Sequence, residues 1–96
     1  MEKADNVILI GKKSPTRYAL AILTSIKKVN TEVFLKARGR SILTCIDATQ
    51  ILKNRFEPTI QLEAITIGTE LVDFKQKDGS TRQSNISSIE IKLKVP

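Results

Sequence analysis

The stretch VILIGKKSP, residues 7–15, combines the end of a predicted strand with the start of a predicted helix. Its first four letters form a short, β-branched apolar run that ends at Gly11, which predicts a strand buried on both faces. Ser14 can cap the first helix amides, and Pro15 suits the first helical position because its missing N–H has no partner there. The helix is expected to run to about Lys28. Its apolar stripe comprises Tyr18 or Ala19, Ile22, Leu23 and Ile26.

Residues 31–58 repeat this order, with a strand followed by a helix. The strand, residues 31–37, alternates, with Val33, Leu35 and Ala37 on one side and Phe34, Lys36 and Arg38 on the other. A second helix is predicted from about Ser41 to Arg55. Its stripe at helical spacing comprises Ile42, Cys45, Ile46, Thr49, Leu52 and Phe56. Leu43 and Ile51 fall off that stripe, which favours burial of a second helix side against another subunit. Pro58 ends the helix.

Two more strands and a long hairpin are predicted after residue 58. Leu62 and Ala64 alternate in one phase and Ile65 and Ile67 in the other, so a bulge is expected near Ala64. The final strand shows regular alternation of Ile89, Ile91, Leu93 and Val95. Between the strands, DFKQKDGSTRQSN (residues 73–85) is polar and contains Asp-Gly, a turn signal because both central residues of the favoured hairpin turn need positive φ. A structureless loop is the alternative, but the turn chemistry favours an antiparallel hairpin that projects into solvent.

The predicted element order is β-α-β-α-β-β within a single domain of residues 1–96. The first βαβ unit should be parallel, with a right-handed crossover. Two helices on one face of a mixed four-stranded sheet give an α+β fold, a two-layer sandwich with a projecting β-hairpin.

The composition argues against an enzyme. The chain has no histidine, so it lacks the usual general base and the commonest metal ligand, and we expect neither a metal site nor a cofactor. Residues 11–14, GKKS, lack the upstream glycine of a phosphate-binding loop, because Asn6 stands at that position. The single cysteine, Cys45, lies in an apolar helical pattern and is expected in the core rather than as a reactive thiol.

No apolar run approaches the roughly 20 residues of a membrane span, and the N-terminus lacks the apolar segment of a signal peptide. We therefore expect a soluble protein that stays in the cell and has no membrane partner.

The positive charge is concentrated in one part of the chain. The net charge is +6, and residues 11–40 hold eight cations against one anion, whereas residues 41–96 hold seven of each. Because parallel strands end at the same edge of a sheet, Lys12 and Lys13 should lie near Lys36, Arg38 and Arg40. Gly39 allows a tight turn there, and the amides that begin the second helix could add to anion binding. This predicts a polyanion-binding patch, and the alternative is a basic face that only aids solubility.

Three blocks, NVILIGKK (6–13), VFLKARGRSI (33–42) and ILKNRFEP (51–58), resemble the Alba family of archaeal chromatin proteins, at matching spacing over nearly the whole chain. The resemblance implies a dimer that coats double-stranded DNA and also binds RNA. It implies phosphate binding by Lys12 and Lys13, and a basic strand-end motif at Lys36, Arg38 and Arg40. Arg17 is a further candidate for nucleic-acid binding, on the strength of the charge cluster.

The resemblance also assigns roles outside this patch. It makes the hairpin of residues 73–85 an arm along the DNA minor groove, with Lys75, Lys77 and Arg82 as its cations. It places Arg55 and Phe56 near contacts within or between dimers. The chain departs from many relatives in having Ser14 where they have proline and Thr44 where a basic residue is common.

From these observations we expect a chromosome-associated cytoplasmic protein that binds double-stranded DNA without sequence preference, coats and compacts it, and also binds RNA. Lys12 is a candidate acetylation site, because acetylation would remove a charge at the centre of the patch. The partner subunit is a second copy or a paralogue. One alternative is a protein that acts mainly on RNA, and another is a small phosphate-ester enzyme, against which the missing histidine speaks.

Overall fold

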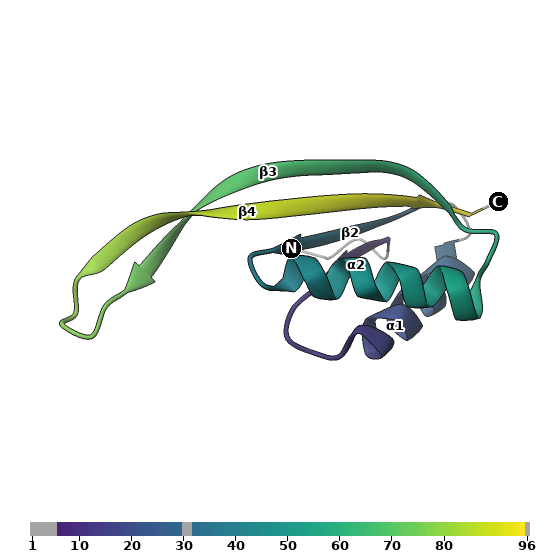
Figure 1. Cartoon of the computed structure of the whole chain (residues 1–96), viewed down its shortest axis with the longest axis horizontal. Coiled ribbons are helices and arrows are strands. Elements are labelled where there is room, and N and C mark those ends of the chain that lie inside the picture. Colours follow the sequence, from purple (N-terminus) through teal and green to yellow (C-terminus); the bar gives the residue numbers. More distant parts are fainter. Residues whose placement is uncertain (1–5, 30–31, 96) are drawn as a thin grey trace.

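The computed structural model describes residues 6–29 and 32–95. The elements are β1 (Val7–Leu9), α1 (Pro15–Val29), β2 (Glu32–Arg38), α2 (Ser41–Ile51), a π-helical turn η1 (Leu52–Phe56), β3 (Gln61–Lys75) and β4 (Thr81–Lys94). With η1 continuing α2, the predicted β-α-β-α-β-β order is confirmed (Figure 1). The predicted start of the second strand, residue 31, lies outside the described residues.

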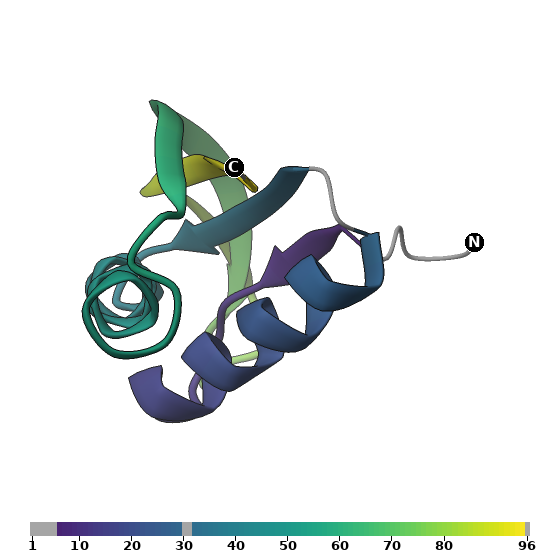
Figure 2. The same cartoon turned by 90° about the vertical axis from the view of Figure 1, so that its right-hand side faces the viewer.

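The four strands form one mixed sheet in the order β1-β2-β4-β3. The β1–β2 pair is parallel and the other two pairs are antiparallel. Both helices cover one face of this sheet, and the other face is open, as the view along the long axis shows (Figure 2). The predicted α+β two-layer sandwich is therefore confirmed.

The core lies between the sheet and the helices. From β2 it takes the side chains of Val33, Leu35 and Ala37, and from β4 those of Ile89, Ile91 and Leu93, as the alternation predicted. From α1 it takes Ala19, Ile22 and Ile26, and from α2 and η1 it takes Cys45, Ala48 and Leu52. Burial raises the pKa of the Cys45 thiol to about 11, because the charged thiolate would lose its hydration in the apolar core.

The start of α1 follows the sequence prediction. The N–H of Arg17 donates to Ser14 Oγ at 3.4 Å, and Pro15 occupies the first helical position.

In α2, Cys45, Thr49 and Leu52 are buried as the stripe predicted, whereas Ile46 and Phe56 remain more than a third exposed. The helix then widens into η1, where the N–H of Glu57 donates to the Leu52 carbonyl five residues earlier at 2.7 Å.

The prediction that β1 is buried on both faces is wrong. β1 forms an edge of the sheet, and Leu9 is 54% exposed while Ile10 just after it is buried. Only one face of this strand is covered, because the helices lie on one side and nothing in the described chain covers the other.

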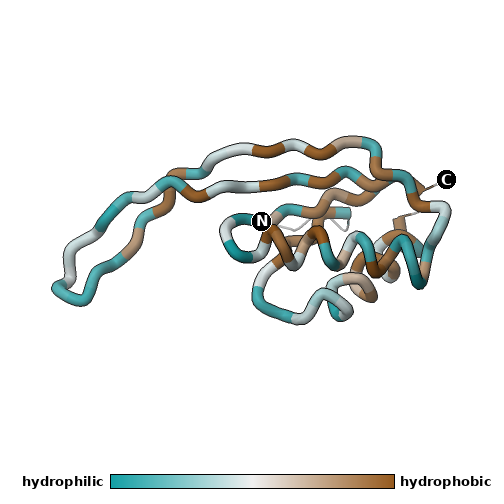
Figure 3. The backbone as a smooth tube through the Cα atoms, viewed as in Figure 1, coloured by the Kyte–Doolittle hydropathy of each residue, from teal (hydrophilic) through white to brown (hydrophobic). Residues whose placement is uncertain are grey.

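The β3–β4 hairpin extends far beyond the body, as predicted. The molecule measures 50 × 27 × 21 Å, and the hairpin accounts for its length (Figure 1). The pairing register shifts between Leu62 and Ala64, which confirms the predicted bulge. The last residue of β2 pairs with Ser88, and the Gly39 N–H still donates to the Ser87 carbonyl. The six residues 81–86 of β4 therefore bond only with β3 and form an arm about 20 Å long. The arm tip is hydrophilic (Figure 3).

The arm ends in a turn that differs from the predicted one. The N–H of Gly79 donates to the Gln76 carbonyl at 3.0 Å, and the N–H of Gln76 donates to the Ser80 carbonyl at 2.7 Å. The loop therefore contains three residues, not two, and Gly79 with φ 91° takes the left-handed position that closes such loops. Asp78 accepts hydrogen bonds from the backbone N–H and the hydroxyl of Ser80, which lower the pKa of its carboxyl.

Candidate nucleic-acid interface

The two cation-bearing loops meet at one end of the body. The N–H of Ile10 donates to the Lys36 carbonyl at 2.8 Å, which extends the β1–β2 pairing past Leu9. One residue further on, Ser41 Oγ donates to the Gly11 carbonyl at 3.2 Å. The loop after β1 thus contacts β2 and the first residue of α2, on either side of the loop after β2, as expected for the ends of two parallel strands.

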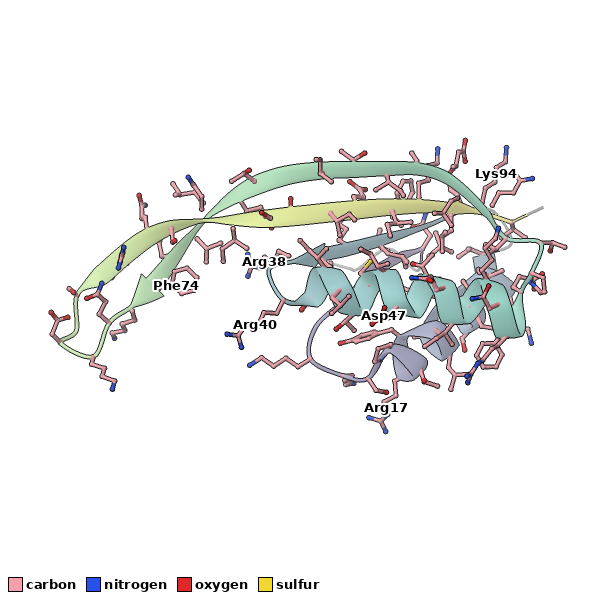
Figure 4. All side chains as sticks on the ribbon, viewed as in Figure 1. Arg17, Arg38, Arg40, Asp47, Phe74 and Lys94 are labelled. Atoms are coloured by element: carbon pink, nitrogen blue, oxygen red, sulfur yellow. The ribbon has the colours of Figure 1, made fainter. Side chains whose placement is uncertain are left out.

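Five cations from these loops and from the end of β2 form what we call the basic end: Lys12, Lys13, Lys36, Arg38 and Arg40. All five side chains are exposed, and none forms an ion pair with another described residue. Arg38 and Arg40 project from the same end of the body, toward the side from which the arm extends (Figure 4). The basic end therefore presents positive charge to solvent without an ion-pair partner among the described residues.

Lys36 differs from the rest of the basic end, because it lies directly opposite Glu90 in the β2–β4 register. Opposite charges in this relation attract, so part of the Lys36 charge is balanced within the sheet.

Further along the open face, Glu32 and Glu63 contact Lys92 at 3.2 and 3.8 Å. These contacts raise the pKa of Lys92 and leave it compensated, unlike Lys12 and Arg38.

The backbone between β2 and α2 turns sharply at Gly39, whose φ of 59° favours glycine. The Gly39 N–H donates to the Ser87 carbonyl at 2.9 Å, so the turn is held against the base of the arm. Arg40 occupies the cap position of α2, no side chain caps this helix, and its first turn has no acidic residue. The positive end of α2 therefore faces the same end of the body as the basic side chains.

Tyr18 is a site residue that the sequence reasoning missed. Its hydroxyl oxygen accepts hydrogen bonds from the N–H of Gly11 at 2.8 Å and from that of Lys13 at 3.3 Å. The sequence pattern assigned Tyr18 to the apolar stripe of α1. The segment GKK begins seven residues before this tyrosine, and that spacing gives no signal of the contact in the sequence.

Arg17 adjoins the basic end through a shallow depression beside Tyr18. The depression is lined by Lys13, Arg17, Tyr18, Leu20 and Ala21. The Arg17 side chain itself points away from the arm (Figure 4).

The other predicted site residues lie elsewhere. Lys75, Lys77 and Arg82 are exposed on the arm, where Arg82 pairs across the strands with Phe74. Arg55 and Phe56 are exposed at the end of η1. Residues 41–56 separate them from the basic end by about 24 Å of helix. The structure thus brings the basic end and the base of the arm together, and keeps Arg55 and Phe56 apart from both.

Among residues 6–29 and 32–95, no group of three acidic, cysteine or histidine side chains is arranged to hold a metal ion. Within the same residues, no helix has the length and apolar character needed to span a bilayer.

Comparisons with known proteins agree on one family. Residues 6–69 match the family model described as Alba. The chain is 39% identical over 90 residues to the DNA/RNA-binding protein Alba 1 of Archaeoglobus fulgidus, covering 94% of this chain and 96% of that protein.

Solved structures give the same result. Alba from Thermoplasma volcanium superposes with a TM-score of 0.80 at 35% identity, covering 93% of this chain and 99% of that chain. ALBA1 from Trypanosoma brucei, at 17% identity and a TM-score of 0.73, covers 98% of this chain and 72% of its own and shares the fold.

Proposed function

This chain belongs to the Alba family, and on that premise we propose that it binds double-stranded DNA without sequence preference, coats and compacts it, and also binds RNA. It acts as a single domain, without a catalytic role or a cofactor, on the chromosome in the cytoplasm. The observation that carries the proposal is the basic end, where two loops distant in sequence place five exposed cations without ion-pair partners in the described chain.

The mechanism is electrostatic. Lysine and arginine side chains at the basic end displace counterions from phosphates, which gives an affinity that falls with salt and depends little on base sequence. Arg38 and Arg40 can each donate two parallel hydrogen bonds to one phosphate. Neither the loop after β1 nor the loop after β2 presents a helix whose exposed polar side chains could read base edges. Phosphate contacts therefore dominate.

The arm extends the contact. It leaves the body on the side of Arg38 and Arg40 and carries Lys75, Lys77 and Arg82, all exposed. Its length of about 20 Å, set by six paired residues per strand, allows it to follow the minor groove away from the basic end.

We further propose a dimer, formed with a second copy or with a paralogue. A set of exposed apolar side chains lies on α2 and β3, and we call it the apolar edge: Leu43, Ile46, Leu62, Ile65 and Ile67. Ile65 and Ile67 share the sheet face that the helices cover, but they lie on the edge strand β3 beyond the helix layer. Ile67 is 80% exposed, and a second subunit would remove this surface from water.

Arg55 and Phe56, at the far end of the body, are available for contacts within or between dimers. Phe56 is 38% exposed, which leaves an aromatic surface for a neighbouring molecule. Such contacts would let bound dimers pack along DNA, which is the basis of the proposed compaction.

The choice between DNA and RNA as main target is tested by competition. A labelled 20-base-pair duplex is bound to the protein at one fixed salt concentration and challenged with unlabelled duplex, then with structured RNA of equal phosphate number. The proposal expects the duplex to compete at least as well as RNA. Much stronger competition by RNA would favour the alternative, a protein that acts mainly on RNA, and absence of binding to either would refute the proposed function.

Lys12 is a proposed acetylation site, because it is an exposed lysine of the basic end. Acetylation would remove one charge and weaken binding to all sequences. Lys12→Gln should mimic this, and equal duplex affinity of Lys12→Gln and the unmodified protein in the same titration would argue against such a switch.

A further inference from the structure

Gly11 joins the two loops of the basic end, because side chains from both helices hold its backbone. Its N–H donates to Tyr18 Oη of α1 at 2.8 Å, and its carbonyl accepts from Ser41 Oγ of α2 at 3.2 Å. Lys12 follows Gly11 directly, and Ser41 follows Arg40 directly. The position of Lys12 relative to Arg40 is therefore fixed through one held residue.

The close approach of Tyr18 depends on the missing side chain of Gly11. A Cβ at this position would lie 3.2 Å from Tyr18 Oη, which is tighter than nine in ten real Cβ contacts. The phenol ring is part-buried in the first turn of α1, so it could give way only by weakening the hydrogen bond. A side chain at position 11 would therefore displace the Tyr18 hydroxyl by a few tenths of an ångström.

The Tyr18 hydroxyl also holds Lys13, two residues after Gly11. The N–H of Lys13 donates to Tyr18 Oη at 3.3 Å. Since the amides of Gly11 and Lys13 both point to Tyr18, they are not offered to a phosphate, and anion binding by this loop depends on the two lysine side chains. A loop held at three points also has less freedom to lose when a ligand binds.

We propose that Tyr18 and Ser41 are positioning residues for nucleic-acid binding, which hold the Gly11 backbone and so fix the spacing between Lys12, Lys13 and the arginines after β2. This inference rests on the proposed function. It adds to it the residues that set the geometry of the phosphate-binding side chains.

The test uses Tyr18→Phe, which keeps the ring and removes the hydroxyl, and Ser41→Ala. Binding of a labelled duplex is titrated over a range of salt concentrations. Each variant should bind about three- to ten-fold more weakly at every salt concentration, because the loosened loop must be ordered when the nucleic acid binds. The salt slope should stay unchanged, because no phosphate contact is lost. Thr24→Val is the matched control, since it removes the hydroxyl bond from Thr24 to the Leu20 carbonyl on the exposed side of α1. Its affinity should stay unchanged.

A double-mutant cycle separates positioning from direct contact. If Tyr18 acts through the lysines, Tyr18→Phe should have no effect in a Lys12→Ala, Lys13→Ala background. An undiminished loss in that background would mean that the hydroxyl contacts the nucleic acid itself, and would overturn the proposal. Unchanged affinity of both Tyr18→Phe and Ser41→Ala in the native background would overturn it as well.

Amide hydrogen exchange in the ligand-free protein gives an independent readout. The amides of Gly11 and Lys13 should exchange faster in Tyr18→Phe than in the native protein, while core amides of β2 keep their protection. Unchanged exchange at both amides would show that the Tyr18 hydroxyl does not hold this loop, and would refute the proposal. This measurement does not require nucleic acid. Failure to bind any nucleic acid would refute the proposed function, whereas hydrogen exchange would still test whether Tyr18 holds the loop.

Discussion

Removing single cations from the basic end should reduce the salt dependence of DNA binding by a fixed step. Each phosphate contact contributes about 0.9 to the slope of log affinity against log salt. The five cations of the basic end contribute about −4.5 to the slope per protomer, apart from the contribution of the arm, so their share of the salt effect is a roughly 500-fold weakening between 50 and 200 mM salt. Lys12→Ala should reduce that factor to roughly 150, and adding Arg38→Ala should reduce it to roughly 40.

The assay is fluorescence anisotropy with two labelled duplexes of unrelated sequence, each titrated at five or more salt concentrations. Lys94→Ala is the matched control, because Lys94 is exposed at the opposite end of the body and its loss changes the net charge equally (Figure 4). Its slope should equal that of the native protein. If Lys12→Ala and Arg38→Ala shifted the slope no more than Lys94→Ala does, net charge rather than the basic end would govern binding, and the reasoning would fail.

Three further predictions concern other parts of the molecule. Ile67→Lys should convert the proposed dimer to a monomer in light scattering at micromolar concentration, because it puts a charge into the apolar edge. The control Leu20→Lys should remain dimeric. Dimers in both variants would contradict the proposed interface. Gly79→Ala should speed amide exchange at the arm tip by straining a residue at φ 91°, at a cost of roughly 1 kcal/mol, and leave the body's melting temperature nearly unchanged. Cys45 should resist alkylation at pH 8 until the protein is unfolded. Its pKa of about 11, against an ordinary 9.0, means that the unfolded chain releases the thiol proton first, so stability should fall as pH rises from 9 toward 11, and this loss should be absent in Cys45→Ala.

The sheet and core could be predicted from sequence where one local pattern governs one element. The alternation of Val33, Leu35 and Ala37 required only that one face of a strand be buried, and that face is the buried one. The phase change at Ala64 likewise had one local explanation, a bulge. Such predictions hold because side-chain direction follows directly from backbone geometry.

Predictions failed where an outcome depended on distant elements. Whether Leu9 is covered depends on the strand order. A purely apolar strand has the same sequence pattern whether it lies at the centre or at the edge of a sheet. Exposure of Ile46 and Phe56 depends on how far the helix layer extends toward β3. The turn at Gly79 differs because the strand register, not the Asp-Gly pair alone, sets the loop length.

The same distinction applies to the site. The two cation runs could be placed together from sequence because parallel strands end at one edge, and charged side chains must stay exposed. The contacts of Tyr18 and Ser41 with Gly11 could not, since they bridge seven and thirty residues and require both helices to be packed on the sheet first.

The arm shows how packing of the core governs a surface remote from it. The inner half of β4 pairs with β2 as well as with β3 and contributes Ile89 and Ile91 to the core, while its outer half pairs only with β3. Since the strands are continuous, the direction of the arm is set by the inner half and by the Gly39 hydrogen bond to the Ser87 carbonyl at its base. The same turn at Gly39 positions Arg38 and Arg40. The arm and the basic end are therefore oriented by one piece of backbone, and under the proposed function a duplex at the basic end would meet the arm at a fixed angle.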